Sequence, residues 1–167
     1  MNLETEVSSV SDHSSHIVSA TADTGFFLIR DLRVGRRNSG QCEQKIVVPS
    51  TGTLIDHCWS SRDDQALLGF SNGMLACVDT RRGQVISLCD SPANLDSIDF
   101  DSDTSTLAAC GKGVTFLTLK SGIFEQSGRY SPKFDREKNN AGVFNGRGHF
   151  YTTAPDGSLV LIDSYHE

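Results

Sequence analysis

The segment Gly69-Phe-Ser71-Asn-Gly73 places a serine between two glycines, in the pattern of an α/β-hydrolase nucleophile. In such an enzyme the serine lies in a sharp turn between a strand and a helix, which exposes its hydroxyl to a histidine. Here residues 74–78 are Met-Leu-Ala-Cys-Val, a run that is typical of a strand. Because a hairpin turn accounts for Asn72 and Gly73, we expect Ser71 to have no catalytic function.

Asp99, Asp101 and Asp103 alternate along the chain, as do the first calcium ligands of an EF-hand loop. An EF-hand also needs a glycine where this chain has Thr104 and a bidentate glutamate where it has Cys110. The three carboxylates therefore predict an acidic loop between two strands, which a basic segment of a partner protein could contact.

The other side chains that could bind a metal or attack a substrate are dispersed. None of the five cysteines belongs to a C-x-x-C pair, and the five histidines lack the spacing of metal ligands. Cysteines inside apolar runs are expected to be reduced and to pack as small hydrophobic residues. No phosphate-binding glycine loop or dinucleotide motif is present. The sequence therefore predicts no cofactor, no metal site and no catalytic residue.

Basic residues form two clusters in segments that we expect to be loops. The first lies in residues 30–37 and the second in residues 128–140. Few aromatic side chains interleave with them, so stacking on RNA bases is not favoured. Loops held by rigid strands are nevertheless where binding residues are most often found. The candidate partner-binding residues are Arg36, Arg37, Arg129, Lys133 and Arg136.

The whole chain is acidic, with 15 lysines and arginines against 21 aspartates and glutamates in 167 residues, a formal net charge of −6. A general nucleic-acid or anionic-membrane binder needs a basic surface, so both classes are disfavoured. No apolar run approaches the roughly 20 residues of a membrane span, and residues 1–9 are too polar for a signal peptide. We expect a protein of the cytoplasm, the nucleus or both, with other proteins as its partners.

The elements that would position these residues repeat along the chain. Four segments consist of a short apolar run, a turn with a glycine and a second apolar run, and their turn glycines are spaced by 48, 40 and 44 residues. An aspartate follows six residues after three of these glycines, and an aromatic residue precedes the last three by 13 or 14 residues. The repeated positions are Gly25, Asp31, Trp59, Gly73, Asp79, Phe100, Gly113, Phe144, Gly157 and Asp163.

Each repeat is predicted to be antiparallel β structure. Its apolar runs are short and rich in β-branched residues, and no helical period persists over three turns. Asn72-Gly73 and Asp156-Gly157 favour type I′ hairpin turns, in which both central residues have positive φ. Four strands in roughly 40–45 residues are typical of a β-propeller blade. We therefore predict an all-β chain with about four four-stranded antiparallel blades, at residues 8–50, 51–90, 91–132 and 139–167.

These repeats resemble those of the WD40 family in the turn glycine, the aspartate six residues later and the aromatic residue of the first strand. The tryptophan of the motif that names the family is replaced by Arg30, Val78, Thr118 and Ile162. The chain has one Gly-His pair, Gly148-His149, which is not at the family's position. The hydrogen-bond network of a typical WD40 blade therefore cannot be complete, and we expect apolar packing between sheets to hold the blades together.

The resemblance implies a non-catalytic scaffold or adaptor that binds other proteins within a multiprotein complex. Two alternatives stay open: a propeller subunit that contacts RNA or a ligand through its basic loops and, less favoured, a propeller-type hydrolase. WD40 rings usually have seven blades, whereas this chain has about four and little strand-like sequence before His16. We therefore expect an incomplete propeller, truncated or completed by another chain, with a closed ring of four blades as the alternative.

Overall fold

The computed structural model describes residues 7–13, 17–22, 26–31, 43–49, 52–61, 64–91, 94–130, 141–146, 148–153 and 157–163. These residues form fifteen strands and no helix, and the strands make four antiparallel sheets that follow one another along the chain. Within each sheet the strands also lie side by side in chain order, so every connection inside a sheet joins two neighbouring strands.

The four sheets are named I to IV. Sheet I contains β1 (Val7–His13), β2 (Ile17–Ala22), β3 (Phe26–Asp31) and β4 (Glu43–Val47). Sheet II contains β5 (Leu54–Trp59), β6 (Gln65–Phe70), β7 (Met74–Asp79) and β8 (Gln84–Asp90). Sheet III contains β9 (Ser97–Asp101), β10 (Thr106–Gly111), β11 (Gly113–Lys120) and β12 (Ile123–Tyr130). Sheet IV contains β13 (Gly142–Phe144), β14 (His149–Thr153) and β15 (Leu159–Asp163).

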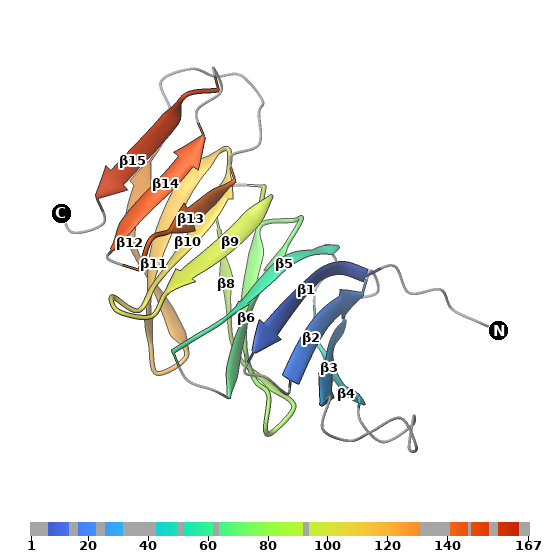
Figure 1. Cartoon of the computed structure of the whole chain (residues 1–167). Coiled ribbons are helices and arrows are strands. Elements are labelled where there is room, and N and C mark those ends of the chain that lie inside the picture. The colour runs from blue at the N-terminus through green and yellow to red at the C-terminus, as the bar shows by residue number, and fades with distance from the viewer. Residues whose placement is uncertain are drawn as a thin grey trace.

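The sheets stack face to face in a fan, from sheet I to sheet IV (Figure 1). Their first strands, β1, β5, β9 and β13, lie side by side across the middle of the fan, and each contacts the next (Figure 1). The last strands lie at the outer edge: β8 alternates between exposed and half-buried residues, whereas β6 is buried along its whole length. A strand that is apolar on both sides is stable there because neighbouring sheets cover both faces of its own sheet.

Three apolar clusters fill the spaces between successive sheets. Sheets I and II meet through Phe27, Ile29, Ile46, Val48, Leu54, Ala66, Leu68, Phe70, Ala76 and Val78. Sheets II and III meet through Leu67, Leu75, Cys77, Leu107, Ala109 and Leu117, together with Leu95 and Ile98. Sheets III and IV meet through Ala108, Cys110, Val114, Phe116 and Phe150. The core is therefore divided among the interfaces between sheets, so each sheet depends on its neighbours.

The hairpin between β6 and β7 differs from its predicted type. Gly73 has φ 88°, but Asn72 is not among the described residues with positive φ, so a type I′ turn at Asn72-Gly73 is wrong. The Gly73 N–H donates to the Phe70 carbonyl at 2.9 Å, and the Asn72 side-chain oxygen accepts from Met74 N at 3.1 Å. A three-residue loop that ends on a left-handed glycine is the common alternative, because its twist also suits the two strands. Asp156 lies outside the described residues.

The prediction of an all-β chain built from small antiparallel sheets is confirmed. Sheet IV differs from the expected four strands, because the described residues 141–146, 148–153 and 157–163 form three. The expectation of little strand before His16 is also wrong, since β1 has seven residues and pairs with β2. Its sequence, Val-Ser-Ser-Val-Ser-Asp-His, has too few apolar residues to signal a strand on its own.

Candidate functional site

Two carboxylates of the first strands cross from one sheet to the next. Asp56 on β5 accepts a hydrogen bond from Ile98 N on β9 at 3.0 Å. Asp99 on β9 accepts one from Phe144 N on β13 at 2.7 Å. Charge-assisted hydrogen bonds of this kind contribute roughly 1.5–3 kcal/mol each. Hydrogen bonds from main chain to side chain therefore join β5 to β9 and β9 to β13, in addition to apolar packing.

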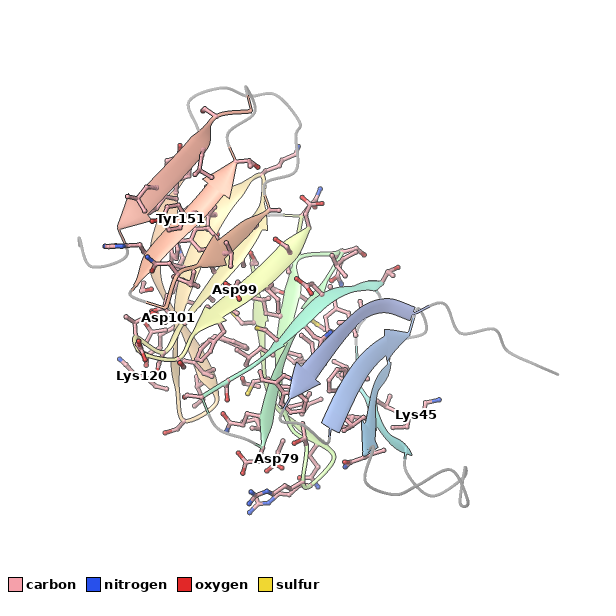
Figure 2. The ribbon with its side chains drawn as sticks, in the orientation of Figure 1. Lys45, Asp79, Asp99, Asp101, Lys120 and Tyr151 are labelled. Carbon is pink, nitrogen blue, oxygen red and sulfur yellow. The ribbon has the colours of Figure 1, made fainter. Side chains whose placement is uncertain are left out.

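The carboxylate of Asp99 is held in an environment that disfavours its charge. Burial makes the largest contribution and raises its pKa above the ordinary value, while backbone N–H groups, first that of Phe144, lower it. The negative charges of Asp56 and Asp101 raise the pKa further. The hydrogen bond of Asp99 therefore stabilises the contact between sheets III and IV, while burial of its charge opposes that stabilisation. Figure 2 places its side chain on β9 in the middle of the fan.

The thiols close to these carboxylates are poor nucleophiles. Burial, followed by the charges of Asp99 and Asp56, raises the pKa of Cys58 well above its ordinary value. Burial is also the main reason why the pKa of Cys110 rises to about 12. Because the thiolate is the reactive form, the raised pKa makes both thiols weaker nucleophiles near neutral pH. Cys58, Cys77, Cys89 and Cys110 are free of disulfides, and Cys42 lies outside the described residues.

The His57 side chain is buried between sheets I and II. Its side chain is 4% exposed and lies edge-on to the Phe27 ring, with the ring centroids 5.3 Å apart. Burial lowers its pKa to about 4, so the imidazole is neutral at physiological pH. The ring joins β5 of sheet II to β3 of sheet I. Within the described part of the chain, no group of three or more His, Cys, Asp or Glu side chains could hold a metal ion.

Ser71, the serine of the hydrolase-like pattern, lies in the turn between β6 and β7. Its hydroxyl accepts a hydrogen bond from Thr53 N at 3.0 Å, and its own backbone N–H donates to the Thr53 carbonyl at 2.8 Å. A strand follows the turn where a hydrolase would have a helix. Ser71 thus ties its turn to the chain segment before β5.

The alternating aspartates do not converge on one point. Asp99 bonds to Phe144 on the next sheet, whereas Asp101 accepts from the Thr104 hydroxyl at 2.7 Å within its own turn. Asp101 is 3% exposed, and Asp103 is exposed in the same turn. The arrangement fits a structural turn with one carboxylate facing solvent.

The aromatic residues of the repeat all lie between sheets. Trp59 packs against the cluster of sheets I and II, and its ring meets Phe27 edge-on at 6.5 Å. Phe100 packs against the cluster of sheets II and III. Phe144 lies 4.9 Å from Phe150 and 6.4 Å from Phe116, ring centroid to centroid.

The turn positions of the repeat are described only in part. Gly73, Gly113 and Gly157 have positive φ, at 88°, 108° and 85°. Asp79 accepts hydrogen bonds from Arg81 N at 2.9 Å and Arg82 N at 2.8 Å, so it closes the turn between β7 and β8. Asp31 and Asp163 end β3 and β15, and their side chains lie outside what the structure describes, as does Gly25.

Turns at one end of sheets II and III form a surface that we call the charged face. Its exposed and half-buried ionic side chains include Asp64, Asp79, Arg81, Arg82, Asp103, Lys120 and Glu125. Arg81 Nη1 lies 3.9 Å from Asp64 Oδ2, and Lys120 Nζ lies 2.6 Å from Glu125 Oε2. Figure 2 shows Asp79 and Lys120 toward this end of the fan. Exposed ion pairs contribute little to stability, so these charges are available to a partner.

A pocket of about 250 Å³ opens between the same turns. Serine hydroxyls and the Gln65 amide provide most of its polar lining, and none of the described residues that line it is ionisable. Ser105 and Ser121, which line it, have φ of 54° and 53°, the left-handed region that is uncommon outside glycine. These described lining residues can form hydrogen bonds, and none of them is an acid, a base or a thiol.

Most of the predicted partner-binding residues lie outside the part of the chain that the structure describes. Arg129 is exposed on β12, opposite Thr115 of β11. Arg36, Arg37, Lys133 and Arg136 lie outside the described residues, so their proposed grouping stays a prediction.

Sequence reasoning missed the carboxylates that bridge the sheets. Asp56 and Asp99 are spaced by 43 residues, which is within the period of the repeat itself. That spacing was the available signal, but an aspartate within a short run favours a turn on propensity alone.

Among the described residues no helix is long and apolar enough to cross a membrane. No model of a protein family matches the chain, and a search of curated proteins finds no match either.

Proposed function

We propose that the chain is a non-catalytic β-propeller segment of the WD40 type that acts as a scaffold or adaptor, holding other proteins in a complex in the cytoplasm, the nucleus or both. The observation that carries the proposal is the stack of sheets whose first strands adjoin and whose faces bury one another. Propeller blades have this arrangement, and it presents turns as fixed surfaces at both ends of the sheets.

The reactive groups support a binding function over catalysis. Asp56 and Asp99 are engaged with backbone N–H groups of neighbouring sheets, and Ser71 is engaged in its turn. Burial keeps the Cys110 thiol and the His57 ring neutral near pH 7. These described side chains thus have structural roles, either between sheets or within a turn.

The charged face is the surface that we assign to recognition. Arg81 and Arg82 are 75% and 79% exposed, and their backbone N–H groups donate to Asp79 and close the turn. Their guanidinium groups form exposed ion pairs, Arg81 Nη1 with Asp64 Oδ2 at 3.9 Å and Arg82 Nε with Asp79 Oδ2 at 3.7 Å. Because exposed ion pairs contribute little to stability, these side chains can be replaced without loss of the turn. A partner with acidic side chains would pair with them, and the adjoining pocket would accept one of its polar side chains.

The test is quantitative affinity purification of the full chain from cell lysate. A variant with Arg81→Glu and Arg82→Glu is expected to recover at least about tenfold less of its partner proteins, a change of roughly 1.4 kcal/mol. Lys112→Glu is the matched control, because Lys112 is exposed in the turn between β10 and β11, at the opposite end of the sheets. Equal recovery by all three proteins would contradict the assignment, and a hydrolase activity lost in Ser71→Ala would contradict the non-catalytic proposal.

A further inference from the structure

Sheet IV is packed against a neighbour on one face. Phe144 and Phe150 point toward sheet III, where their rings meet Phe116. The other face, which we call the open face, contains Val143, Tyr151, Leu159 and Leu161. Val143 and Leu161 both pair with Tyr151, on its two sides, and Leu159 lies two residues from Leu161 on the same strand.

The open face is apolar and exposed. Val143, Leu159 and Leu161 are 57%, 69% and 55% exposed, and Figure 2 shows Tyr151 on β14 at the end of the fan. Soluble proteins rarely expose large contiguous apolar patches, and such patches mark interaction sites.

The preceding sheets show what covers the same face. In sheet II this face carries Leu67, Leu75 and Cys77, and sheet III packs on it. In sheet III it carries Ala108, Cys110 and Phe116, and sheet IV packs on it. The open face continues this series, so a sheet with an apolar face is the occupant that matches it.

The bridges between first strands give a second and independent indication. On β9, Ile98 N donates to the preceding sheet and the next residue, Asp99, accepts from the following sheet. On β13, Phe144 N donates to the preceding sheet, and the next residue is Asn145. Asn145 is exposed, with its Nδ2 at 3.4 Å from His149 Nδ1, and an amide oxygen has two acceptor sites. It therefore has the position from which Asp99 accepts.

We propose that the open face of sheet IV is covered by sheet I of a second copy of the chain, and that two copies joined head to tail close a ring of eight sheets. This inference rests on the proposed propeller architecture. Two identical joints related by a two-fold axis would leave no sheet face uncovered, and eight blades lie within the range of known propellers.

Sheet I has one described feature that the joint requires, an exposed aliphatic side chain on its outward face. Val47 is 69% exposed, and it pairs with Phe26, while the neighbouring pair of Phe27 and Ile46 is buried against sheet II. The outward face of sheet I therefore has an exposed aliphatic residue of its own. On β1, Ser11 precedes Asp12 as Ile98 precedes Asp99, so the backbone N–H of the partner's Ser11 is the donor to Asn145.

The first test is the mass of the full chain in solution, measured by size-exclusion chromatography with light scattering over a concentration series. We expect twice the chain mass of 18.1 kDa. Leu161→Arg is expected to weaken the dimer at least about tenfold, because a charged group would be buried in an apolar joint. Ile123→Arg is the matched control, since Ile123 is 57% exposed but lies on β12, outside the open face. A monomeric wild-type chain, an unlimited head-to-tail assembly or equal effects of the two variants would overturn the ring.

A second test examines the register and does not depend on destabilising the fold. The double variant Ser11→Cys with Asn145→Cys is expected to form a covalent dimer on mild oxidation, visible on a non-reducing gel. The pair Ser11→Cys with Ile123→Cys should stay monomeric on the same gel, and equal yields would overturn the assigned register. A chain that is monomeric but still loses its partners on reversal of Arg81 and Arg82 would overturn the ring and leave the proposed function standing.

Discussion

Sheets II and IV have the same order of antiparallel strands, but they differ in what covers them. Sheet II is packed on both faces, and its second strand, β6, is buried at every residue. Sheet IV is packed on one face, and its second strand, β14, alternates in burial. The sequences match this difference, because β6 is apolar throughout its centre and β14 places Phe150 and Thr152 on the covered side. The pattern of apolar residues in each second strand therefore matches the number of neighbouring sheets that cover it.

The largest expected effect tests how far each sheet is stabilised by its neighbours. Phe150→Ala removes the ring that meets Phe116 at 5.5 Å, and it should cost about 4 kcal/mol. Leu68→Ala, at a position with 0% exposure in sheet II, should cost about 3 kcal/mol. Because sheet IV is packed on one face, hydrogen exchange in Phe150→Ala should accelerate in β13–β15 and leave β5–β8 protected.

Leu68→Ala should instead accelerate exchange in sheets I, II and III together, because sheet II supports neighbours on both sides. Hydrogen exchange followed by mass spectrometry distinguishes the two patterns. Uniform acceleration in both variants would mean that the four sheets unfold as one unit, and the contrast between sheets II and IV would then have no energetic meaning.

The second effect concerns pH and belongs to the interface between sheets I and II. The pKa of His57 is about 4 in the folded chain and 6.5 ordinarily, so acidification protonates the unfolded chain first. The contribution of His57 to the free energy of unfolding is therefore fully present above pH 6.5. It is lost as the pH falls toward 4, by roughly 3 kcal/mol. Urea unfolding at a series of pH values should show this loss, and His57→Phe should reduce it.

Asp99 acts in the opposite direction, because its pKa is raised by burial and its protonation in the folded chain favours folding at low pH. The comparison of wild type with His57→Phe at each pH separates the two groups. If both proteins lose the same stability between pH 6.5 and 4, the buried imidazole is not the cause, and the difference between this interface and that of sheet IV lies elsewhere.

The contrast also explains what could be predicted from the sequence. The glycine turns and the aromatic residues Trp59, Phe100 and Phe144 are local signals that recur at similar spacing, and they predicted the small antiparallel sheets. β1 was missed because its Ser-rich sequence becomes a strand through pairing with β2, which no local pattern shows. The turn at Asn72 was assigned the wrong type because Asn-Gly suits both a two-residue and a three-residue loop.

The bridging carboxylates were missed for a related reason. Asp56 and Asp99 find their donors 42 and 45 residues away, so their role depends on how sheets stack. The candidate binding residues are the least predictable part, since Arg81 and Arg129 are exposed and an exposed side chain follows no periodic pattern. Periodicity specifies what packs inside, and it leaves the recognition surface undetermined.

The smallest expected effect tests whether the bridge depends on its charge. Asp99→Asn keeps an oxygen that can accept from Phe144 N, and it removes a carboxylate that burial disfavours. A neutral hydrogen bond is weaker than a charged one by roughly 1 kcal/mol, and the relief of desolvation offsets that loss. We therefore expect a change of less than about 1 kcal/mol in urea unfolding at pH 7. Asp99→Ala, which leaves the Phe144 N–H without this acceptor, should cost about 2 kcal/mol. Equal costs for the two variants would show that the carboxylate charge, and not the position of an acceptor oxygen, holds sheet IV to sheet III. Asn145 would then be a poor substitute for aspartate at the next joint.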